Sequence, residues 1–209
     1  MTGNTRDTHQ TGSQERWRVF CALELTSSAR TRLMEHINRL RQTVPNAAAS
    51  WSREQNLHLT LKFLGELAPP GVRKLSDAAA AAVTKVSSFQ ISIEEPGVFP
   101  KRGKPRVLWL RVKDETGMLS KLQLRLKEAC AREGFAREDR PFHPHLTLAR
   151  LRKPQGAHTL AETHHQLIFE PVKAEIRELL VIRSELNRDG SKYTVISRHA
   201  LAAQVDESV

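Results

Sequence analysis

The sequence has little cysteine and no long apolar run, and each shortage excludes a class of protein. The two cysteines among 209 residues, Cys21 and Cys130, lie far apart and form no C-x-x-C pair, so neither a disulfide framework nor a thiolate zinc site is expected. Residues 1–16 lack the apolar segment of a secretory signal, and no later run approaches the ~18 apolar residues of a membrane span. We therefore expect a protein of the reducing cytoplasm, with no membrane partner.

Acidic residues are also outnumbered. The chain has 33 Lys and Arg against 23 Asp and Glu, which gives a net charge of +10 and a pI near 10.1. This charge favours an anionic partner such as nucleic acid or a phosphorylated small molecule, although a solvated basic surface is the alternative. The basic residues of segment 101–106 could likewise contact an RNA backbone or only be solvated.

Hydrophobic periodicity predicts alternating strands and helices over residues 17–199. Strands are expected at 18–25, 57–64, 89–95, 106–112, 142–151, 171–185 and 192–199, and helices at about 27–44, 69–86 and 116–134. Segment 157–166 could be a short helix or a loop, and residues 187–190 read as a hairpin turn. Residues 1–16 and 200–209 are expected to be tails, the first of them disordered.

One motif occurs twice, each time inside a predicted strand. It reads HLTL at residues 58–61 and again at residues 145–148. Because side chains alternate between the two faces of a strand, the histidine and threonine of each copy share one face while the leucines point to a core. Each copy also follows a strand and a helix. We therefore predict an α+β fold with two similar lobes of antiparallel sheet, related by a pseudo-two-fold axis within one bilobal domain (17–199), whose motif strands face each other across a groove.

Two histidines across a groove suit paired acid and base catalysis. Because an unperturbed imidazole has a pKa near 6.5, one ring can accept a proton while the other donates one. Threonine hydroxyls beside them are suited to the oxygens of a phosphoryl group. Two alternatives are a pair of purely structural histidines and a zinc site formed by His58, His143 and His145, which no carboxylate motif supports.

The longer strings NLHLTLKFLG (56–65) and FHPHLTLAR (142–150) resemble the signature of the two-histidine phosphoesterases. They are most similar to the bacterial and archaeal RNA 2′,3′-cyclic phosphodiesterases, formerly called 2′-5′ RNA ligases, and the similarity covers about residues 18–199. The resemblance implies hydrolysis of a terminal RNA 2′,3′-cyclic phosphate to a 2′-phosphate, with no metal or other cofactor. The same groups would serve the reverse, ligating direction.

The resemblance also implies a role for particular residues. His58 would protonate the departing 3′ oxygen, His145 would activate the attacking water, and Thr60 and Thr147 would hold the non-bridging oxygens. The expected partner is RNA with a 2′,3′-cyclic phosphate end, or a cyclic nucleotide, and the chain is expected to act as a monomer. The alternative is a noncatalytic RNA- or nucleotide-binding module that uses the same groove.

Two further residues are implied by the resemblance, namely Arg150 as a phosphate ligand and Phe63 as a stacking surface for the terminal base. Strict alternation places both on the leucine side of their strands, so each needs a strand end, a twist or a bulge to reach the groove. Otherwise they are a core aromatic and a surface arginine. Tyr193, the single tyrosine, could pack in a hairpin or contact substrate, and His36 is expected at the surface of the first helix.

Overall fold

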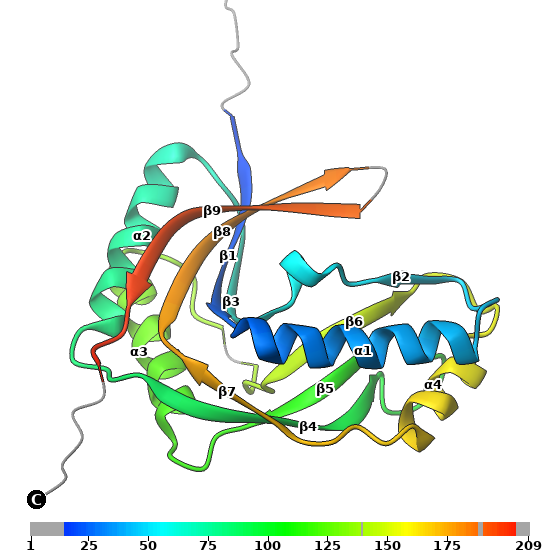
Figure 1. Cartoon of the computed structure of the whole chain (residues 1–209). Coiled ribbons are helices and arrows are strands. Elements are labelled where there is room, and N and C mark those ends of the chain that lie inside the picture. Colours follow the sequence, from blue (N-terminus) through cyan, green and yellow to red (C-terminus); the bar gives the residue numbers. More distant parts are fainter. Residues whose placement is uncertain (1–14, 139, 188–189, 204–209) are drawn as a thin grey trace, which may run out of the picture.

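The computed structural model describes residues 15–138, 140–187 and 190–203. The predicted N-terminal tail therefore lies almost wholly outside the described residues. In chain order the elements are β1 (Trp17–Glu24), α1 (Ser27–Thr43), β2 (Ala49–Trp51), the 3-10 turn η1 (Glu54–Asn56), β3 (His58–Leu67), α2 (Pro69–Val83), β4 (Phe89–Phe99), β5 (Val107–Lys113), α3 (Met118–Arg132), β6 (His145–Leu151), α4 (Ala157–Gln166), β7 (Val172–Ile176), β8 (Glu178–Asn187) and β9 (Gly190–Ala200) (Figure 1).

The strands form two sheets, one for each copy of the motif. The first sheet has the order β3-β1-β8-β9, the second has the order β2-β6-β5-β4-β7, and the paired strands are antiparallel. The first motif strand, β3, pairs with β1, and the second, β6, pairs with β5. The predicted α+β fold with two similar antiparallel lobes is confirmed.

The two lobes are not the two halves of the sequence. The predicted strand 171–185 is in fact two strands, because β7 pairs with β4 in the second sheet whereas β8 pairs with β1 in the first. The corner lies at Arg177, whose carbonyl accepts a hydrogen bond from the Leu201 amide. The alternation of apolar residues continues across this corner, so periodicity predicts a single strand. The division into β7 and β8 arises because the two parts pair with strands of different sheets.

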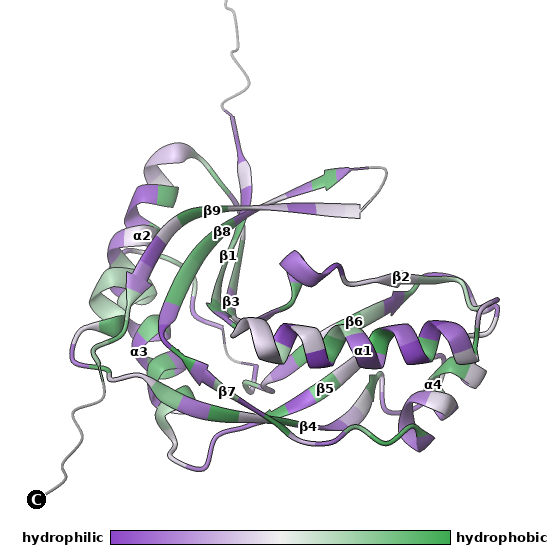
Figure 2. Ribbon diagram, viewed as in Figure 1, coloured by the Kyte–Doolittle hydropathy of each residue, from purple (hydrophilic) through white to green (hydrophobic). Residues whose placement is uncertain are grey.

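The helices are exchanged between the lobes. Although α1 follows β1 of the first sheet, it contacts β7 and α4, whereas α3, which follows β5 of the second sheet, contacts α2 and β3. Both sheets and the helices carry green apolar segments in Figure 2, and one continuous cluster of buried side chains joins the two lobes. The exchange therefore joins the two sheets through one shared core.

Two local expectations change, and one open alternative is decided. Residues 49–51, expected in a loop, form β2 beside β6. Segment 157–166, expected as a short helix or a loop, is a helix. The C-terminal tail begins later than residue 200, because Leu201 is buried and Ala202 pairs with Ser87. Asn187 pairs with Gly190 across the predicted turn, while residues 188–189 lie outside the described residues.

In the part of the chain that the structure describes, no helix is long and apolar enough to cross a membrane.

Candidate active site

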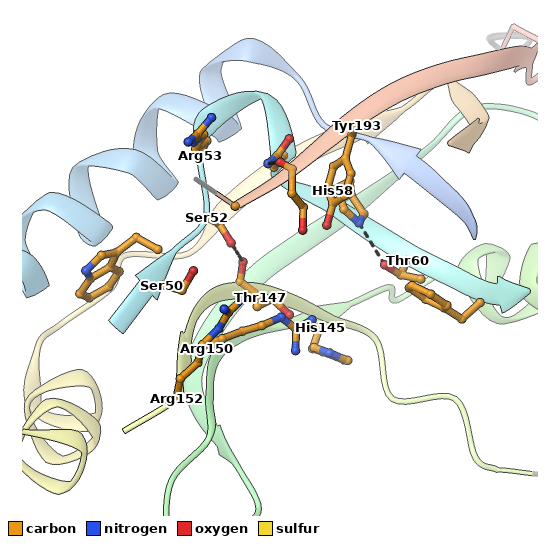
Figure 3. Close-up of a pocket in the computed structure, with 15 residues that line it drawn as sticks. Ser50, Ser52, Arg53, His58, Thr60, His145, Thr147, Arg150, Arg152 and Tyr193 are labelled. Carbon is orange, nitrogen blue, oxygen red and sulfur yellow. Dashed lines mark hydrogen bonds between the residues drawn. The ribbon is translucent and has the colours of Figure 1, made fainter. Parts of the chain in front are cut away.

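The two motif strands meet at one pocket. Strands β3 and β6 are in contact, and both histidine–threonine pairs line the same hollow, with His58 and Thr60 on one side and His145 and Thr147 on the other (Figure 3). The full lining consists of Ser50, Trp51, Ser52, Arg53, Asn56, His58, Thr60, Phe63, His145, Thr147, Arg150, Arg152, Gly190, Ser191 and Tyr193. All six residues predicted for the site are therefore brought together.

A β-bulge in each motif strand explains how Phe63 and Arg150 reach the pocket. Along β3 the pairing passes from Thr60 to Lys62 while β1 advances by one residue, so that Leu61 is the extra residue. Along β6 it passes from Thr147 to Ala149, so that Leu148 is the extra residue. A bulge shifts the alternation by one, and both bulges lie at the same motif position. The fifth residue after each histidine consequently returns to the histidine face.

His58 is held in an aromatic surround. Its ring lies 4.9 Å from the ring of Phe20 and 5.3 Å from that of Tyr193. The Nε2 atom is 3.1 Å from the hydroxyl of Thr60, and the ring also forms a hydrogen bond to the Asn56 backbone. Burial lowers the pKa of His58 to about 4, more than the backbone hydrogen bond raises it. In the free site His58 is therefore neutral at pH 7.

His145 has its proton placed by the backbone. Its Nδ1 atom lies 2.7 Å from the carbonyl oxygen of His143, and because a carbonyl only accepts, Nδ1 carries the hydrogen. The Nε2 atom of the neutral ring is then a free base. Burial lowers the pKa of His145, and the nearby Arg150 lowers it further. This arrangement suits a group that accepts a proton.

Phe63 presents an aromatic face beside the first histidine. Its side chain is 46% exposed and stacks on Phe20 with ring centroids 5.4 Å apart and planes 10° apart. The guanidinium of Arg18 lies 5.1 Å from the Phe63 ring centroid. A supported and exposed ring of this kind can stack on a nucleobase.

Several pocket residues could not be identified from the sequence, because their place in the pocket depends on tertiary contacts. Ser52 donates a hydrogen bond from Oγ to the carbonyl of Thr147 at 2.8 Å, and the Asn56 amide donates to the Ser191 carbonyl at 2.9 Å. Arg152 adds a second cation close to Arg150 (Figure 3). No spacing rule signals Ser52 or Ser191, since β2 and β9 are brought to the pocket by sheet pairing. Asn56 and Arg152 lie close to the motifs along the chain, and that nearness was the one signal that could have found them.

Tyr193 packs against the buried cluster of the first sheet and also lines the pocket, while its contact with substrate stays a prediction. The three-histidine zinc alternative is not supported: nowhere in residues 15–138, 140–187 or 190–203 do three His, Cys, Asp or Glu side chains gather as metal ligands would. The basic loop 101–106 does not line this pocket, and Lys101 lies at a separate hollow beside Trp109.

Comparison with known proteins agrees with this geometry. Residues 28–188 match the family model described as the 2′-5′ RNA ligase superfamily. The RNA 2′,3′-cyclic phosphodiesterase of Methanothermobacter thermautotrophicus is 34% identical over 181 residues, which cover 85% of this chain and 95% of the relative. The enzyme of the same name from Geobacillus stearothermophilus is 31% identical over 193 residues, but these cover 92% of this chain and only 60% of that longer relative.

A solved structure shows the same fold. The crystal structure of Escherichia coli LigT complexed with 3′-AMP superimposes with a TM-score of 0.67 at 28% sequence identity, and the match covers 90% of this chain and 99% of LigT. The family model spans most of the chain and includes both motif strands. The chain belongs to the 2′-5′ RNA ligase superfamily.

Proposed function

We propose that this protein is an RNA 2′,3′-cyclic phosphodiesterase that hydrolyses a terminal 2′,3′-cyclic phosphate to a 2′-phosphate without a metal ion or other cofactor. The observation that carries the proposal is the convergence of two histidine–threonine pairs and Arg150 on one pocket. The names of the relatives and the 3′-AMP bound by LigT support the same class of substrate. The net charge of +10 fits an RNA partner.

The pocket supplies each group that the reaction needs. The Nε2 atom of His145 takes a proton from water as the water oxygen attacks phosphorus, and His58 gives a proton to the departing 3′ oxygen as the P–O3′ bond breaks. The hydroxyls of Thr60 and Thr147 and the guanidinium of Arg150 hold the non-bridging oxygens, whose negative charge grows in the transition state. The 2′ oxygen keeps the phosphate, so the product is a 2′-phosphate.

Substrate binding is expected to favour the protonated form of His58, which is neutral in the free site. Burial keeps His58 neutral at pH 7 in the free protein, but a bound phosphate anion stabilises the imidazolium and raises the pKa of His58. The acid is thus charged when the phosphate is in place. When a 5′-hydroxyl takes the place of water as the nucleophile, the same groups open the cyclic phosphate and a 2′-5′ linkage forms.

The protein is proposed to act as a cytoplasmic monomer. Both sheets that build the pocket come from one chain, so the site needs no second subunit. Cys21 and Cys130 are both free and buried, which fits a reducing compartment.

The test uses a short RNA with a 2′,3′-cyclic phosphate end in excess EDTA, with 2′- and 3′-phosphate products resolved. Conversion to the 2′-phosphate is expected, and His58→Ala and His145→Ala should each lower turnover by ~10²-fold or more. His199→Ala is the matched control, because His199 bonds to Ser197 outside the pocket. Bound but unconverted RNA would instead favour a noncatalytic binding module, and conversion that stops in EDTA would refute metal independence.

A further inference from the structure

A second stacked aromatic pair lies beside His145, and the mechanism above does not use it. The ring centroids of Phe99 and Trp109 are 4.8 Å apart and their planes differ by 28°. The ring of His145 lies 5.1 Å from Phe99 and 5.9 Å from Trp109. Both aromatic side chains are partly exposed. His145, the proposed general base, therefore lies beside an aromatic surface.

This pair is the counterpart of the pair in the first lobe. There Phe20 stacks on Phe63, and Phe20 lies 4.9 Å from His58. Each lobe thus sets one stacked pair against its own histidine. A linear phosphodiester joins two nucleosides, one on either side of phosphorus, and each of the two histidines has one aromatic pair beside it. One surface is already assigned to the terminal base, which leaves the other without an occupant.

The indole of Trp109 is placed on the pocket face by the second sheet. Trp109 pairs with Thr147 on one side and with Gly97 on the other, so the three residues form one row across β4, β5 and β6. A Cβ atom added to Gly97 would lie only 2.2 Å from the indole. The ring can therefore occupy this position only because residue 97 has no side chain.

The charge around the pair suits a polyanion. A hollow adjoining Trp109 is also lined by Lys101, Arg111 and the acidic Glu162, all of them exposed. Arg111 is ion-paired with Glu95 at 3.2 Å, and the exposed Arg102 and Lys104 follow Lys101 in the adjacent loop. An aromatic platform with basic side chains beside it is the combination that holds single-stranded nucleic acid.

We propose that Phe99 and Trp109 form a second nucleoside site, which holds the first base of an RNA whose 5′-hydroxyl takes the place of water beside His145. The inference rests on the proposed function and names its second substrate. The 5′ oxygen attacks phosphorus and its proton passes to His145, while the P–O3′ bond breaks and the 3′ oxygen takes a proton from His58. The product is a 2′-5′ phosphodiester with a free 3′-hydroxyl.

The experiment measures how one cyclic phosphate is shared between water and an added alcohol. RNA with a 2′,3′-cyclic phosphate end is incubated with increasing concentrations of a dinucleotide that has a free 5′-hydroxyl, and the ratio of ligated to hydrolysed product is recorded. Trp109→Leu should lower this ratio roughly 5- to 100-fold, the range expected for loss of stacking on one base. Phe63→Leu is the matched control from the first lobe: it should raise KM for the cyclic phosphate and leave the ratio unchanged.

The product ratio distinguishes a Trp109 that binds the added dinucleotide from a Trp109 that only positions His145. A misplaced His145 would slow hydrolysis and ligation equally and leave their ratio unchanged. An unchanged ratio in Trp109→Leu, or an equal fall in Phe63→Leu, would overturn the second site. If Trp109→Leu does not fold, Phe99→Leu tests the same platform, and a dinucleotide lacking its first base tests it in the unmodified protein, where ligation should fall by the same factor. Hydrolysis without any ligation would overturn this inference alone, whereas absence of both reactions would overturn the proposed function.

Discussion

Acid should destabilise the fold through a buried pair of histidines, His36 of α1 and His164 of α4. The Nε2 atom of His164 lies 3.0 Å from the carbonyl oxygen of Trp109, so it carries a hydrogen. The Nδ1 atom of His164 then accepts from Nε2 of His36 at 3.3 Å. Both rings are buried, so the expectation that His36 lies at the surface was wrong. Its partner lies 128 residues away along the chain. The periodicity of α1 therefore gave no sign that a buried polar partner was present.

The magnitude follows from the pKa values. Burial lowers the pKa of each ring from 6.5 to about 4; charges on His164 and Arg39 lower the pKa of His36 further, and His165 lowers that of His164. Because the folded state binds these protons less readily than the unfolded chain, their contribution is complete above pH 6.5 and is lost as the pH falls towards 4. One pKa unit corresponds to about 1.4 kcal/mol, so each ring accounts for a loss of about 2 kcal/mol between pH 8 and pH 5.

The comparison that isolates the pair uses His164→Gln, whose amide can still donate to the Trp109 carbonyl but does not titrate. Urea unfolding, followed by tryptophan fluorescence at pH 8, 7, 6 and 5, should show that the unmodified protein loses about 2 kcal/mol more stability than the variant over this range. His158→Gln, at an exposed position of the same helix, should behave like the unmodified protein. Parallel stability curves for the His164→Gln variant and the unmodified protein would refute the reasoning.

Three further predictions concern the pocket and its surroundings. Because burial lowers the pKa of both His58 and His145, the charged acid becomes more populated as the pH falls, so kcat/KM should rise from pH 8 to pH 6; a steady fall over that range, measured with the cyclic phosphate RNA, would contradict this. Arg150 lowers the pKa of both histidines, so Arg150→Gln should shift the pH dependence of kcat/KM to higher pH. The same variant should lower kcat/KM by about tenfold or more, as expected for loss of a charged phosphate ligand. A pH dependence that does not shift would argue against the electrostatic effect of Arg150 on the histidines. Gly97→Ala should lower the free energy of unfolding by about 1–3 kcal/mol, because the added methyl group overlaps the Trp109 indole; an unchanged urea midpoint would show that the indole moves aside freely.

The motifs were readable in the sequence because they are local. Two HLTL strings in apolar surroundings require only the alternation of a strand to pair each histidine with its threonine and to bury the leucines. The structure agrees: Leu59 and Leu146 are fully buried, while the histidines line the pocket. The helices α1, α2 and α3 were likewise visible, because each has an apolar stripe with a spacing of three or four residues.

The bulges at Leu61 and Leu148 could not be predicted from the same alternation. A bulge depends on how a strand pairs with its neighbour, and both neighbours, β1 and β5, are set by the packing of whole sheets. Without the bulges Phe63 and Arg150 would point into the core, so the need for an irregularity could be stated from the sequence but its position could not.

The sequence by itself determined that two strands each carry a histidine and a threonine on one face, because strand periodicity is a property of a few neighbouring residues. Only the tertiary structure decided that β7 and β8 part into different sheets, that α1 and α3 cross to the opposite lobes, and that β2 and β9 bring Ser52 and Tyr193 to the pocket. These outcomes depend on contacts between segments far apart along the chain, where the burial of shared apolar surface chooses among pairings that local sequence allows equally.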